Sequence, residues 1–543
     1  MKLGEHLRVR PEMELLLCCA RTTLSPQHAA RIHEIASGPL DWEWLLPAAD
    51  EHALIPLLHW HLHAVGGDAV PAAWRGMLDE LFRENARRNL LSTSRLLEIM
   101  DSAARAGVAP IPYKGPVLAA TAYGNLSLRR FVDLDVLVRD ADMPRAEQAL
   151  VSLGYQPETP YSSNGTRAGW PGQYCFQRAE HPPQLVEVHT ERTLRYAPRP
   201  FNFERIWARA QTTNVGGRTL RTLAPEDQFT LLCVHGTKHM WERLAWITDI
   251  AELVRKHRDE GWNAIITTAQ QAGAERMVRL GLGLAGDLLD APLPDAAREW
   301  LAVDSATLRA AEQISRRIFG EGPPRGVLQR FRFRARMAPG ALGGLSYAAR
   351  LTLSPTEEDW NQGNGFSQRA RRVLRLARKY GLGGGQPQRD LGGFEPTPPE
   401  VAERMLALAG VQAGDVLYDL GCGDGQIVVT AAKQFGIRAV GVDVDPQRLI
   451  EARAKAAQAG VAAQVEFVQC DAKKVSLTAA TVVTLYLPWA SNLRLRRRLR
   501  ETLRPGARIV SRGAGMGDWT PERSEEVQDA RGKSNPLHLW VIR

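Results

Sequence analysis

Residues 415–425 read DVLYDLGCGDG, and this stretch decides the fold of the C-terminal part of the chain. Residues 415–420 predict a buried strand, and Gly421, Gly423 and Gly425 follow in a turn. Residues 426–435, QIVVTAAKQF, continue as a predicted helix. A strand, a glycine-rich turn and a helix N-terminus let the backbone approach a nucleotide-like ligand, with amide groups directed at it.

Two further predicted strands end in acids. Residues 438–446, RAVGVDVDP, carry Asp443 at the end of a second strand, and residues 466–471, EFVQCD, carry Asp471 at the end of a third. An acid at the tip of the second strand is where a βαβ nucleotide-binding fold holds ribose hydroxyls. A dinucleotide fingerprint is the alternative, but the glycines here form GxGxG rather than GxGxxG. A Rossmann-like domain is therefore expected.

This region resembles class I S-adenosylmethionine-dependent methyltransferases. It is most similar to a group marked by FEPTPPEVAERML at 394–406, ATVVTLYLP at 480–488 and PGARIVSRGAGMGDWTP at 505–521. That group includes eukaryotic protein-lysine methyltransferases and many bacterial members without an assigned substrate. The resemblance implies S-adenosylmethionine as cofactor and a nitrogen or oxygen acceptor, in a protein or a small molecule, with a protein lysine favoured.

The resemblance also assigns roles to five residues of the cofactor site. Asp419, Gly421 and Gly423 would flank the methionine part of the cofactor. Asp443 would bind the ribose hydroxyls, and Asp471 would lie near the adenine.

Residues 486–489, YLPW, end the predicted fourth strand, where the methyl acceptor should lie. The tetrad is loosely similar to the (D/N)PP(Y/F) motif of amino-methylating enzymes. Tyr486 lacks the acidic or amide side chain of that motif and Leu487 replaces a proline, so a nucleic-acid base is a less favoured target. Pro488 and Trp489 are candidate acceptor-pocket residues, with ordinary packing as the alternative.

The first half carries a second group of acids. Residues 128–138, LRRFVDLDVLV, predict a strand on which Asp133 and Asp135 share one face, and residues 184–190, QLVEVHT, predict another strand with Glu187. Three carboxylates on adjacent strands suit a magnesium-dependent phosphoryl-transfer site. The alternative is that the Asp133 and Asp135 charges protect a sheet edge from aggregation.

Residues 10–380 resemble an uncharacterised bacterial nucleotidyltransferase family of the polymerase-β superfamily. The resemblance rests on residues 114–139, on EVH at 187–189 and on residues 231–254, LLCVHGTKHMWERLAWITDIAELV. It implies that Asp133, Asp135 and Glu187 are catalytic and hold metal. It also places Lys114 and Gly115, with Arg129, at the phosphates of a nucleoside triphosphate, although the superfamily usually has a Gly-Ser pair where Lys114 and Gly115 stand.

Residues 231–254 are expected to form one helix whose His235 and His239 face the site, with Trp241 and Trp246 anchoring the helix. Near the N-terminus, His59, His61 and His63 alternate in HWHLH. No carboxylate or cysteine follows them at ligand spacing, so packing is the favoured interpretation.

Composition agrees with a multidomain globular protein. The 543 residues include 69 Lys and Arg against 60 Asp and Glu, which permits a nucleic-acid partner without requiring one. Six scattered cysteines without a repeated CxxC spacing favour a reducing cytoplasm. The only apolar run near the N-terminus, residues 15–20, is too short for a signal peptide, and no run is long enough for a membrane helix.

The expected architecture is a multidomain α/β protein. Residues 1–381 form an α+β nucleotidyltransferase-like domain. It has helices over 1–107, a sheet that carries the carboxylates over 108–200, and helices over 201–381. A linker follows at 382–393, and residues 394–543 form the methyltransferase domain. The expected function is bifunctional, methyl transfer plus magnesium-dependent nucleotidyl transfer to an unknown acceptor. The alternative is a methyltransferase carrying an inactive nucleotidyltransferase-like module that binds the substrate.

Overall fold

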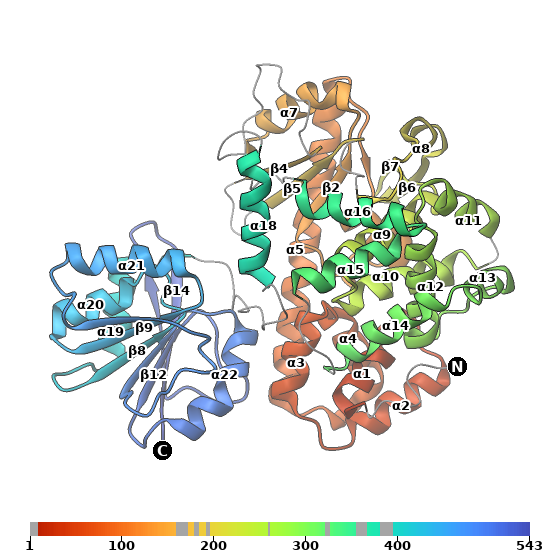
Figure 1. Cartoon of the computed structure of the whole chain (residues 1–543). Helices are drawn as coiled ribbons and strands as arrows, with labels where there is room; N and C mark the ends of the chain where they lie inside the picture. The colour runs from red at the N-terminus through yellow and green to blue at the C-terminus, as the bar shows by residue number, and fades with distance from the viewer. Residues whose placement is uncertain are drawn as a thin grey trace. The chain divides into compact units, whose positions relative to one another are not determined.

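The structure, a computed structural model, describes residues 9–158, 172–178, 184–191, 196–258, 261–320, 326–354, 366–380 and 395–543. The chain forms two compact units, one built mainly from residues before 387 and one mainly from residues 387–543 (Figure 1). The predicted linker, 382–393, lies outside the described residues. Among the helices that are described, none combines the length and the apolar character that crossing a membrane requires.

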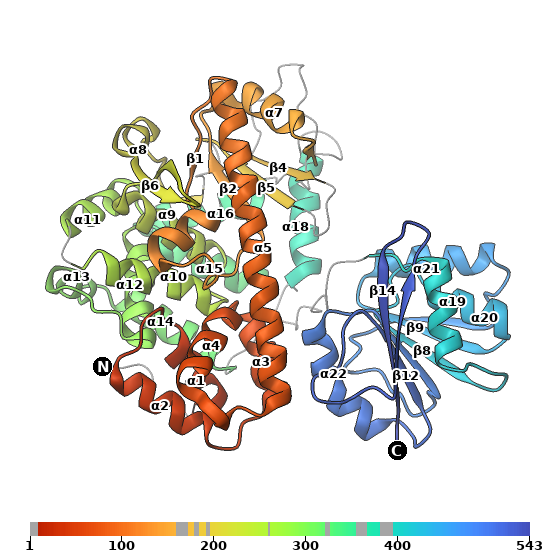
Figure 2. The same cartoon turned by 180° about the vertical axis from the view of Figure 1, so that it is seen from behind.

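The first unit begins with helices and continues into a mixed sheet (Figures 1 and 2). The helices of this part of the chain are α1 (Pro11–Cys19), α2 (Pro26–Ala36), α3 (Trp42–Glu51), α4 (Ile55–His61) and the long α5 (Ala72–Arg105). Residues 41–48, which include most of α3, and residues 72–77 at the start of α5 are grouped with the second unit. The sheet has the strand order β1-β2-β5-β4-β3. Its strands are β1 (Ile111–Pro112), β2 (Asp133–Leu137), β3 (Gln156–Pro157), β4 (Gln173–Arg178) and β5 (Gln184–His189), and α7 (Met143–Ser152) follows β2.

The two faces of this sheet have different cores. Leu134 and Val136 of β2 pack with Val186 of β5 and with apolar residues of α5 and α7. Leu137 belongs to a separate core that includes residues of α8 (Phe203–Arg209) and α9 (Pro225–Lys238). Because side chains alternate along a strand, Asp133 and Asp135 lie on the Leu137 face.

In the remainder of the first unit, the described residues form helices and one hairpin, β6 (Gln211–Val215) with β7 (Arg218–Thr222), which the prediction of helices over 201–381 missed. Its turn contains Gly216 and Gly217, both with positive φ, a sequence typical of a tight hairpin turn. The helices after α9 are α10 (Leu244–Lys256), α11 (Trp262–Gln271), α12 (Glu275–Leu289), α13 (Asp295–Leu301), α14 (Ser305–Ile318), α15 (Val327–Met337), α16 (Ala341–Leu353) and α18 (Phe366–Tyr380).

The single helix expected over residues 231–254 is wrong. The chain forms α9 and α10, separated by a turn in which Met240 and Trp241 have φ of 59° and 53°. This turn places the Trp241 indole in the core, where it is fully buried against Gly236 and Gly281. A Cβ on Gly236 would lie 2.7 Å from three atoms of the Trp241 ring. Burial of a large aromatic side chain therefore compensates for the backbone strain.

The second unit is a seven-stranded sheet with helices on both faces, so the predicted Rossmann-like fold is confirmed. The strand order is β10-β9-β8-β11-β12-β14-β13, parallel from β10 to β12 and antiparallel for the last two strands. The strands are β8 (Val416–Leu420), β9 (Arg438–Asp443), β10 (Val465–Gln469), β11 (Val482–Leu485), β12 (Arg508–Arg512), β13 (Arg523–Gln528) and β14 (Ser534–Val541). The helices are α19 (Pro399–Leu408), α20 (Gln426–Phe435), α21 (Pro446–Gln458) and α22 (Trp489–Thr502).

Two cores hold these layers together. Residues of α19 and α20 pack on one face of the sheet, and Leu495 and Leu499 of α22 pack on the other (Figure 2). Strand β8 lies at the point where the strand order reverses, with β9 on one side and β11 on the other. In parallel α/β sheets, ligands bind outside the carboxyl ends of the strands at this point.

Candidate active sites

The glycine turn after β8 has the conformation that its sequence predicts. The Gly421 and Cys422 amides donate to the Val442 carbonyl at 2.8 and 3.1 Å, which ties the turn to the end of β9. Gly421 has a φ of 84°, and a Cβ there would lie 2.7 Å from a methyl carbon of Leu487. Gly425 begins α20 from a left-handed conformation. Only glycine fits position 421, because both its backbone angle and its surroundings exclude a side chain.

Asp443 connects the two strand ends. Its Oδ2 accepts a hydrogen bond from the Gly423 amide at 2.8 Å, and its Oδ1 accepts one from the Asp445 amide at 2.9 Å. The carboxylate thereby lies beside the glycine turn, and each oxygen keeps a free lone pair for a further donor. This geometry suits recognition of two ribose hydroxyls, the role that the sequence predicts.

Asp419 lies deeper in the sheet. Its side chain is buried and accepts a hydrogen bond from Thr484 of β11 at 2.8 Å. Burial, together with the nearby charges of Asp443 and Asp424, raises the pKa of Asp419 to about 7. A positively charged ligand group beside Asp419 would lower this pKa and favour the ionised carboxylate.

The other predicted residues of this unit lie around the same edge. Cys470, which precedes Asp471, donates its amide to the Asp443 carbonyl at 3.0 Å, so Asp471 begins its turn next to Asp443. Asp471 itself accepts from the Lys473 amide at 2.9 Å. Pro488 caps α22 and is exposed, and Trp489 is its first residue. No finding tests the acceptor-pocket role of these two residues, which stays a prediction.

In the first unit, the strands bring the carboxylates together. β2 and β5 are parallel, with Asp135 opposite Glu187. Oδ1 of Asp135 accepts hydrogen bonds from Lys114 Nζ at 2.8 Å and His189 Nε2 at 3.0 Å. The atoms of Asp135, Glu187 and His189 that could bind a metal ion lie within 4.8 Å of one another. His189 therefore joins the site, and the EVH alternation is the sequence signal for it.

The electrostatics of this cluster favour a cation. Burial and the neighbouring Asp135 charge raise the pKa of Asp133 to about 6. The pKa of Asp135 is lowered because Lys114 and His189 outweigh the opposing effect of burial. Oδ2 of Asp135 is buried and has no hydrogen-bond partner among the described residues. The ligand atoms that lie together belong to Asp135, Glu187 and His189, and Asp133 is not among them. The unpartnered Asp135 oxygen and the Glu187 carboxylate match the oxygen ligands that Mg²⁺ prefers.

The residues predicted to contact phosphate already contact other residues of the chain. Lys114 is paired with Asp135, and Gly115 lies against Asp133, since a Cβ on Gly115 would be 3.3 Å from the Asp133 carbonyl oxygen. The Arg129 guanidinium forms two hydrogen bonds to Asp249 of α10, at 2.8 and 2.9 Å. A phosphate contact by Lys114 or Arg129 would require the side chain to exchange its carboxylate partner for the ligand.

His235 of α9 and His239, which follows the last residue of α9, lie near Lys114. The rings of His235 and His239 are 4.7 Å apart, and Trp246 of α10 contacts both. Burial lowers the pKa of both histidines well below its usual value, and the positive charge of Lys114 lowers that of His235 further. Both imidazoles are therefore neutral at physiological pH.

The HWHLH segment has a carboxylate neighbour that its own sequence does not supply. His59 Nε2 lies 2.7 Å from Asp79 of α5, and His63 stacks beside His59. A carboxylate thus lies beside these histidines although none follows them at ligand spacing, because Asp79 comes from a separate helix.

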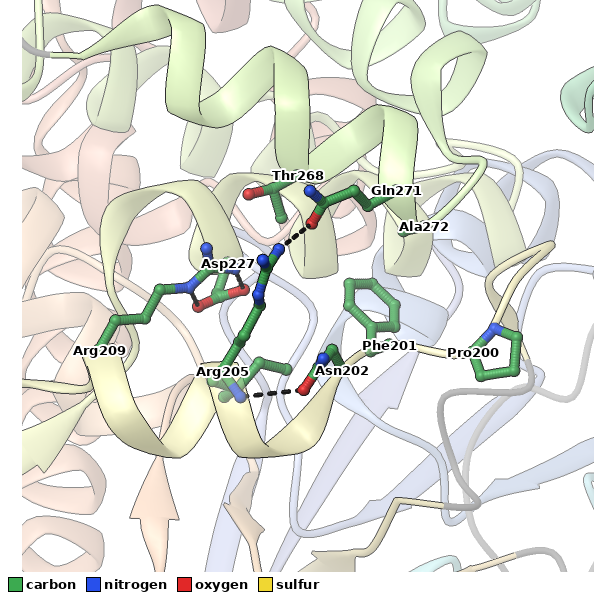
Figure 3. Close-up of a pocket in the computed structure, with 10 residues that line it drawn as sticks. Pro200, Phe201, Asn202, Arg205, Arg209, Asp227, Thr268, Gln271 and Ala272 are labelled. Carbon is green, nitrogen blue, oxygen red and sulfur yellow. Dashed lines mark hydrogen bonds and ion pairs between the residues drawn. The ribbon is translucent and has the colours of Figure 1, made fainter.

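A cavity of about 240 Å³ opens between α8 and α11. Figure 3 shows that its charged side chains face one another: Arg209 pairs with Asp227, and Arg205 donates to Gln271 at 2.9 Å. These contacts satisfy the polar groups within the cavity wall, and neither of the acid clusters predicted from the sequence lines it.

Comparison with known proteins agrees with this division. Residues 38–290 match the family described as "Uncharacterised nucleotidyltransferase", and residues 419–523 match the "ANTKMT methyltransferase domain". A "Protein-lysine N-methyltransferase" of Saccharolobus islandicus is 39% identical over 150 residues, which are 27% of this chain and 92% of that protein. The "Adenine nucleotide translocase lysine N-methyltransferase" of Mus musculus is 37% identical over 120 residues, 22% of this chain and 52% of that protein.

Among solved structures, an RNA methyltransferase from Salinibacter ruber in complex with S-adenosyl-L-homocysteine is 47% identical. The similarity covers 27% of this chain and 94% of that one, with a TM-score of 0.26.

The second unit is thus a class I S-adenosylmethionine-dependent methyltransferase, joined to a nucleotidyltransferase-like unit. The chain belongs to the ANTKMT methyltransferase family through residues 419–523, and residues 38–290 match the model of an uncharacterised nucleotidyltransferase family.

Proposed function

We propose that the chain is a bifunctional enzyme that methylates protein lysine from S-adenosylmethionine and transfers a nucleotide to an unknown acceptor in a magnesium-dependent reaction. The methyltransferase part is carried by one observation: Asp443 lies beside the glycine turn with both carboxylate oxygens held by backbone amides. Lysine as acceptor is supported by the names of the archaeal and mouse relatives.

Bound at the β8–β9 edge, S-adenosylmethionine supplies an electrophilic methyl group. Asp443 would hold the ribose, and Asp419 would lie near the cationic end of the methionine part. The glycine turn would let the cofactor approach the backbone closely. Methyl transfer depends mainly on alignment of the acceptor with the methyl carbon, so these residues position the cofactor and need not move a proton.

A labelling experiment tests the methyltransferase proposal. The purified chain is incubated with methyl-tritiated S-adenosylmethionine and, separately, with cell protein, cell RNA and the small-molecule fraction. We expect label in protein, recovered as methyl-lysine after acid hydrolysis. Label only in RNA or small molecules would refute lysine as the acceptor, and no label in any fraction would refute methyl transfer as the activity.

The nucleotidyltransferase part is supported by the buried Asp135 oxygen and by the pairing of Asp135 with Glu187 across β2 and β5. Asp133, Asp135 and Glu187 would hold Mg²⁺, which supplies charge neutralisation for nucleotide phosphates. Radiolabelled nucleoside triphosphates, incubated with the chain and cell fractions, are expected to label an acceptor with Mg²⁺ and the native Asp135. An Asp135→Asn chain is expected to transfer no label.

A binding module without nucleotidyl transfer is the second candidate. The observation that favours it is that Lys114 and Arg129, the predicted phosphate contacts, are both engaged by carboxylates of the chain itself. If this candidate is right, neither the native chain nor Asp135→Asn transfers label from any of the four nucleoside triphosphates.

A further inference from the structure

The carboxyl edge of the second sheet carries a cluster of polar side chains next to the cofactor turn. Leu485 of β11 pairs with Leu420 of β8 and with Ser511 of β12. The residues that come next are Tyr486 after β11, Gly421 after β8 and Arg512 on β12, so these three positions lie side by side. Tyr486 thus follows the strand that borders the cofactor turn, on the side away from Asp443.

Tyr486 is held in one orientation by its neighbours. Its hydroxyl donates to Glu395 Oε2 at 2.6 Å, and the Arg512 guanidinium lies over its ring at 3.9 Å from the centroid. Arg512 is itself buried, donating to Asn535 at 2.9 Å and contacting Thr397. The buried Arg512 therefore fixes the Tyr486 ring, and the Tyr486 hydroxyl in turn holds the Glu395 carboxylate.

The remaining oxygen of Glu395 binds an ammonium group. Nζ of Lys533 donates to Glu395 Oε1 at 2.6 Å. Lys533 closes the turn between β13 and β14, where its amide is bound to Asp529 Oδ1 at 2.9 Å. Because β14 runs antiparallel to β12, this turn lies at the same edge of the sheet as Arg512. A lysine side chain thus extends from a surface turn to a Tyr–Glu pair beside the cofactor turn.

We propose that Glu395 and Tyr486 form the acceptor site for the substrate lysine, and that Lys533 occupies the position of the substrate ammonium. This inference rests on the proposed lysine methyltransferase activity. The side chain of Glu395 is 47% exposed and that of Lys533 is 35% exposed, so an incoming lysine can reach the carboxylate and displace Lys533. A carboxylate with a tyrosine hydroxyl provides the acceptors that an ammonium with three donors requires.

Glu395 binds the lysine and does not act as its base. Partial burial would raise the pKa of Glu395, but the hydrogen bonds from Lys533 and Tyr486 outweigh it and lower the pKa. The bound ammonium therefore loses its proton to water. The nitrogen lone pair then forms a bond to the methyl carbon while the carbon–sulfur bond breaks, which leaves methyl-lysine and S-adenosylhomocysteine.

Two substitutions of opposite effect test the site, with poly-L-lysine as the probe and methyl-tritiated S-adenosylmethionine as donor. Glu395→Gln is expected to raise the KM for poly-L-lysine about five- to tenfold, a moderate effect because the carboxylate is half exposed. Lys533→Met removes the internal competitor and is expected to lower that KM about threefold. Neither substitution should change the Kd for S-adenosylmethionine by more than about twofold.

Matched controls separate local recognition from net charge. Glu501→Gln on α22 and Lys433→Met on α20 change the charge of the same unit at exposed positions, and both should leave the KM unchanged. Tyr486→Phe keeps the ring, removes the hydroxyl and should raise the KM about threefold, which tests the site independently of Glu395.

The other possible results each contradict either the acceptor site or the proposed activity. An unchanged KM in Glu395→Gln, or a raised KM in Lys533→Met, would overturn the acceptor site while the proposed activity stands. Labelling of cell protein without labelling of poly-L-lysine would also overturn it, because a site for the ammonium group alone accepts any exposed lysine. If the native chain binds S-adenosylmethionine but labels no lysine in either probe, the failure lies in the proposed function.

Discussion

Replacement of Asp443 by alanine tests the cofactor site most directly. In the structure, the Asp443 carboxylate accepts hydrogen bonds from the Gly423 and Asp445 amides, and it has lone pairs left for two ribose hydroxyls. A hydrogen bond to a charged group contributes about 1.5–3 kcal/mol. Two such bonds, reduced because the carboxylate is partly exposed, amount to about 2–4 kcal/mol. We therefore expect the Kd for S-adenosylmethionine to rise about 30- to 1,000-fold.

Isothermal titration calorimetry measures this change, and Asp445→Ala is the matched control. Asp445 caps α21 by accepting a hydrogen bond from the Gln447 amide at 2.8 Å, so its loss should cost about 1 kcal/mol of stability. The control should bind the cofactor within about twofold of the native chain. A Kd for Asp443→Ala within threefold of the native value, in a chain that melts normally, would refute the assignment of Asp443 to the ribose.

Three further predictions concern stability. Since burial raises the pKa of Asp419 to about 7, ionisation of Asp419 destabilises the folded state as pH rises from about 4 to 7. Asp419→Asn should therefore raise the free energy of unfolding, measured by chemical denaturation, by up to about 4 kcal/mol at pH 8 and by almost nothing at pH 4. Gly236→Ala should lower it by about 1–3 kcal/mol, because the new methyl group overlaps the Trp241 ring; an unchanged melting temperature would contradict this packing. Arg129→Met should destabilise by about 3–5 kcal/mol, since it leaves the Asp249 carboxylate buried without its cation, and Arg129→Met combined with Asp249→Leu should recover most of that loss.

Local sequence sufficed for the cofactor edge of the second unit. The strand, the glycine turn and the helix at 415–435 follow one another without interruption, so their contacts depend mainly on near neighbours. The turn glycines have positive φ as their sequence predicts, and Asp443 reaches Gly423 because parallel strands end at one edge. Alternation along β2 likewise placed Asp133 and Asp135 on one face.

Local sequence did not predict the end of the helix at 231–254, where contacts with a distant residue matter. The spacing of apolar residues over 231–254 is helical throughout, yet the chain turns at Met240 and Trp241. The turn buries the indole against Gly281 of α12, where a Cβ would lie 2.9 Å from the ring, as well as against Gly236. No pattern within 231–254 contains that information.

The sequence also did not predict the partners of the charged side chains. The sequence identified Arg129 and Lys114 as cations near a phosphate site, but the pairing of Arg129 with Asp249, 120 residues away, follows from the docking of α10. Glu395 lay within a motif that the sequence marked, and only the sheet brings Tyr486 and Lys533 to it from 91 and 138 residues away.

The sequence by itself therefore determined the class of each unit, the cofactor turn and the strands that carry the acids, because these depend on periodicity and on turns within about thirty residues. The tertiary structure alone decided which carboxylate each cation meets, including the pairing of the Lys533 ammonium with Glu395. Ion pairs and hydrogen bonds form between side chains that strand order and helix docking bring within about 3 Å, and neither is encoded in local spacing.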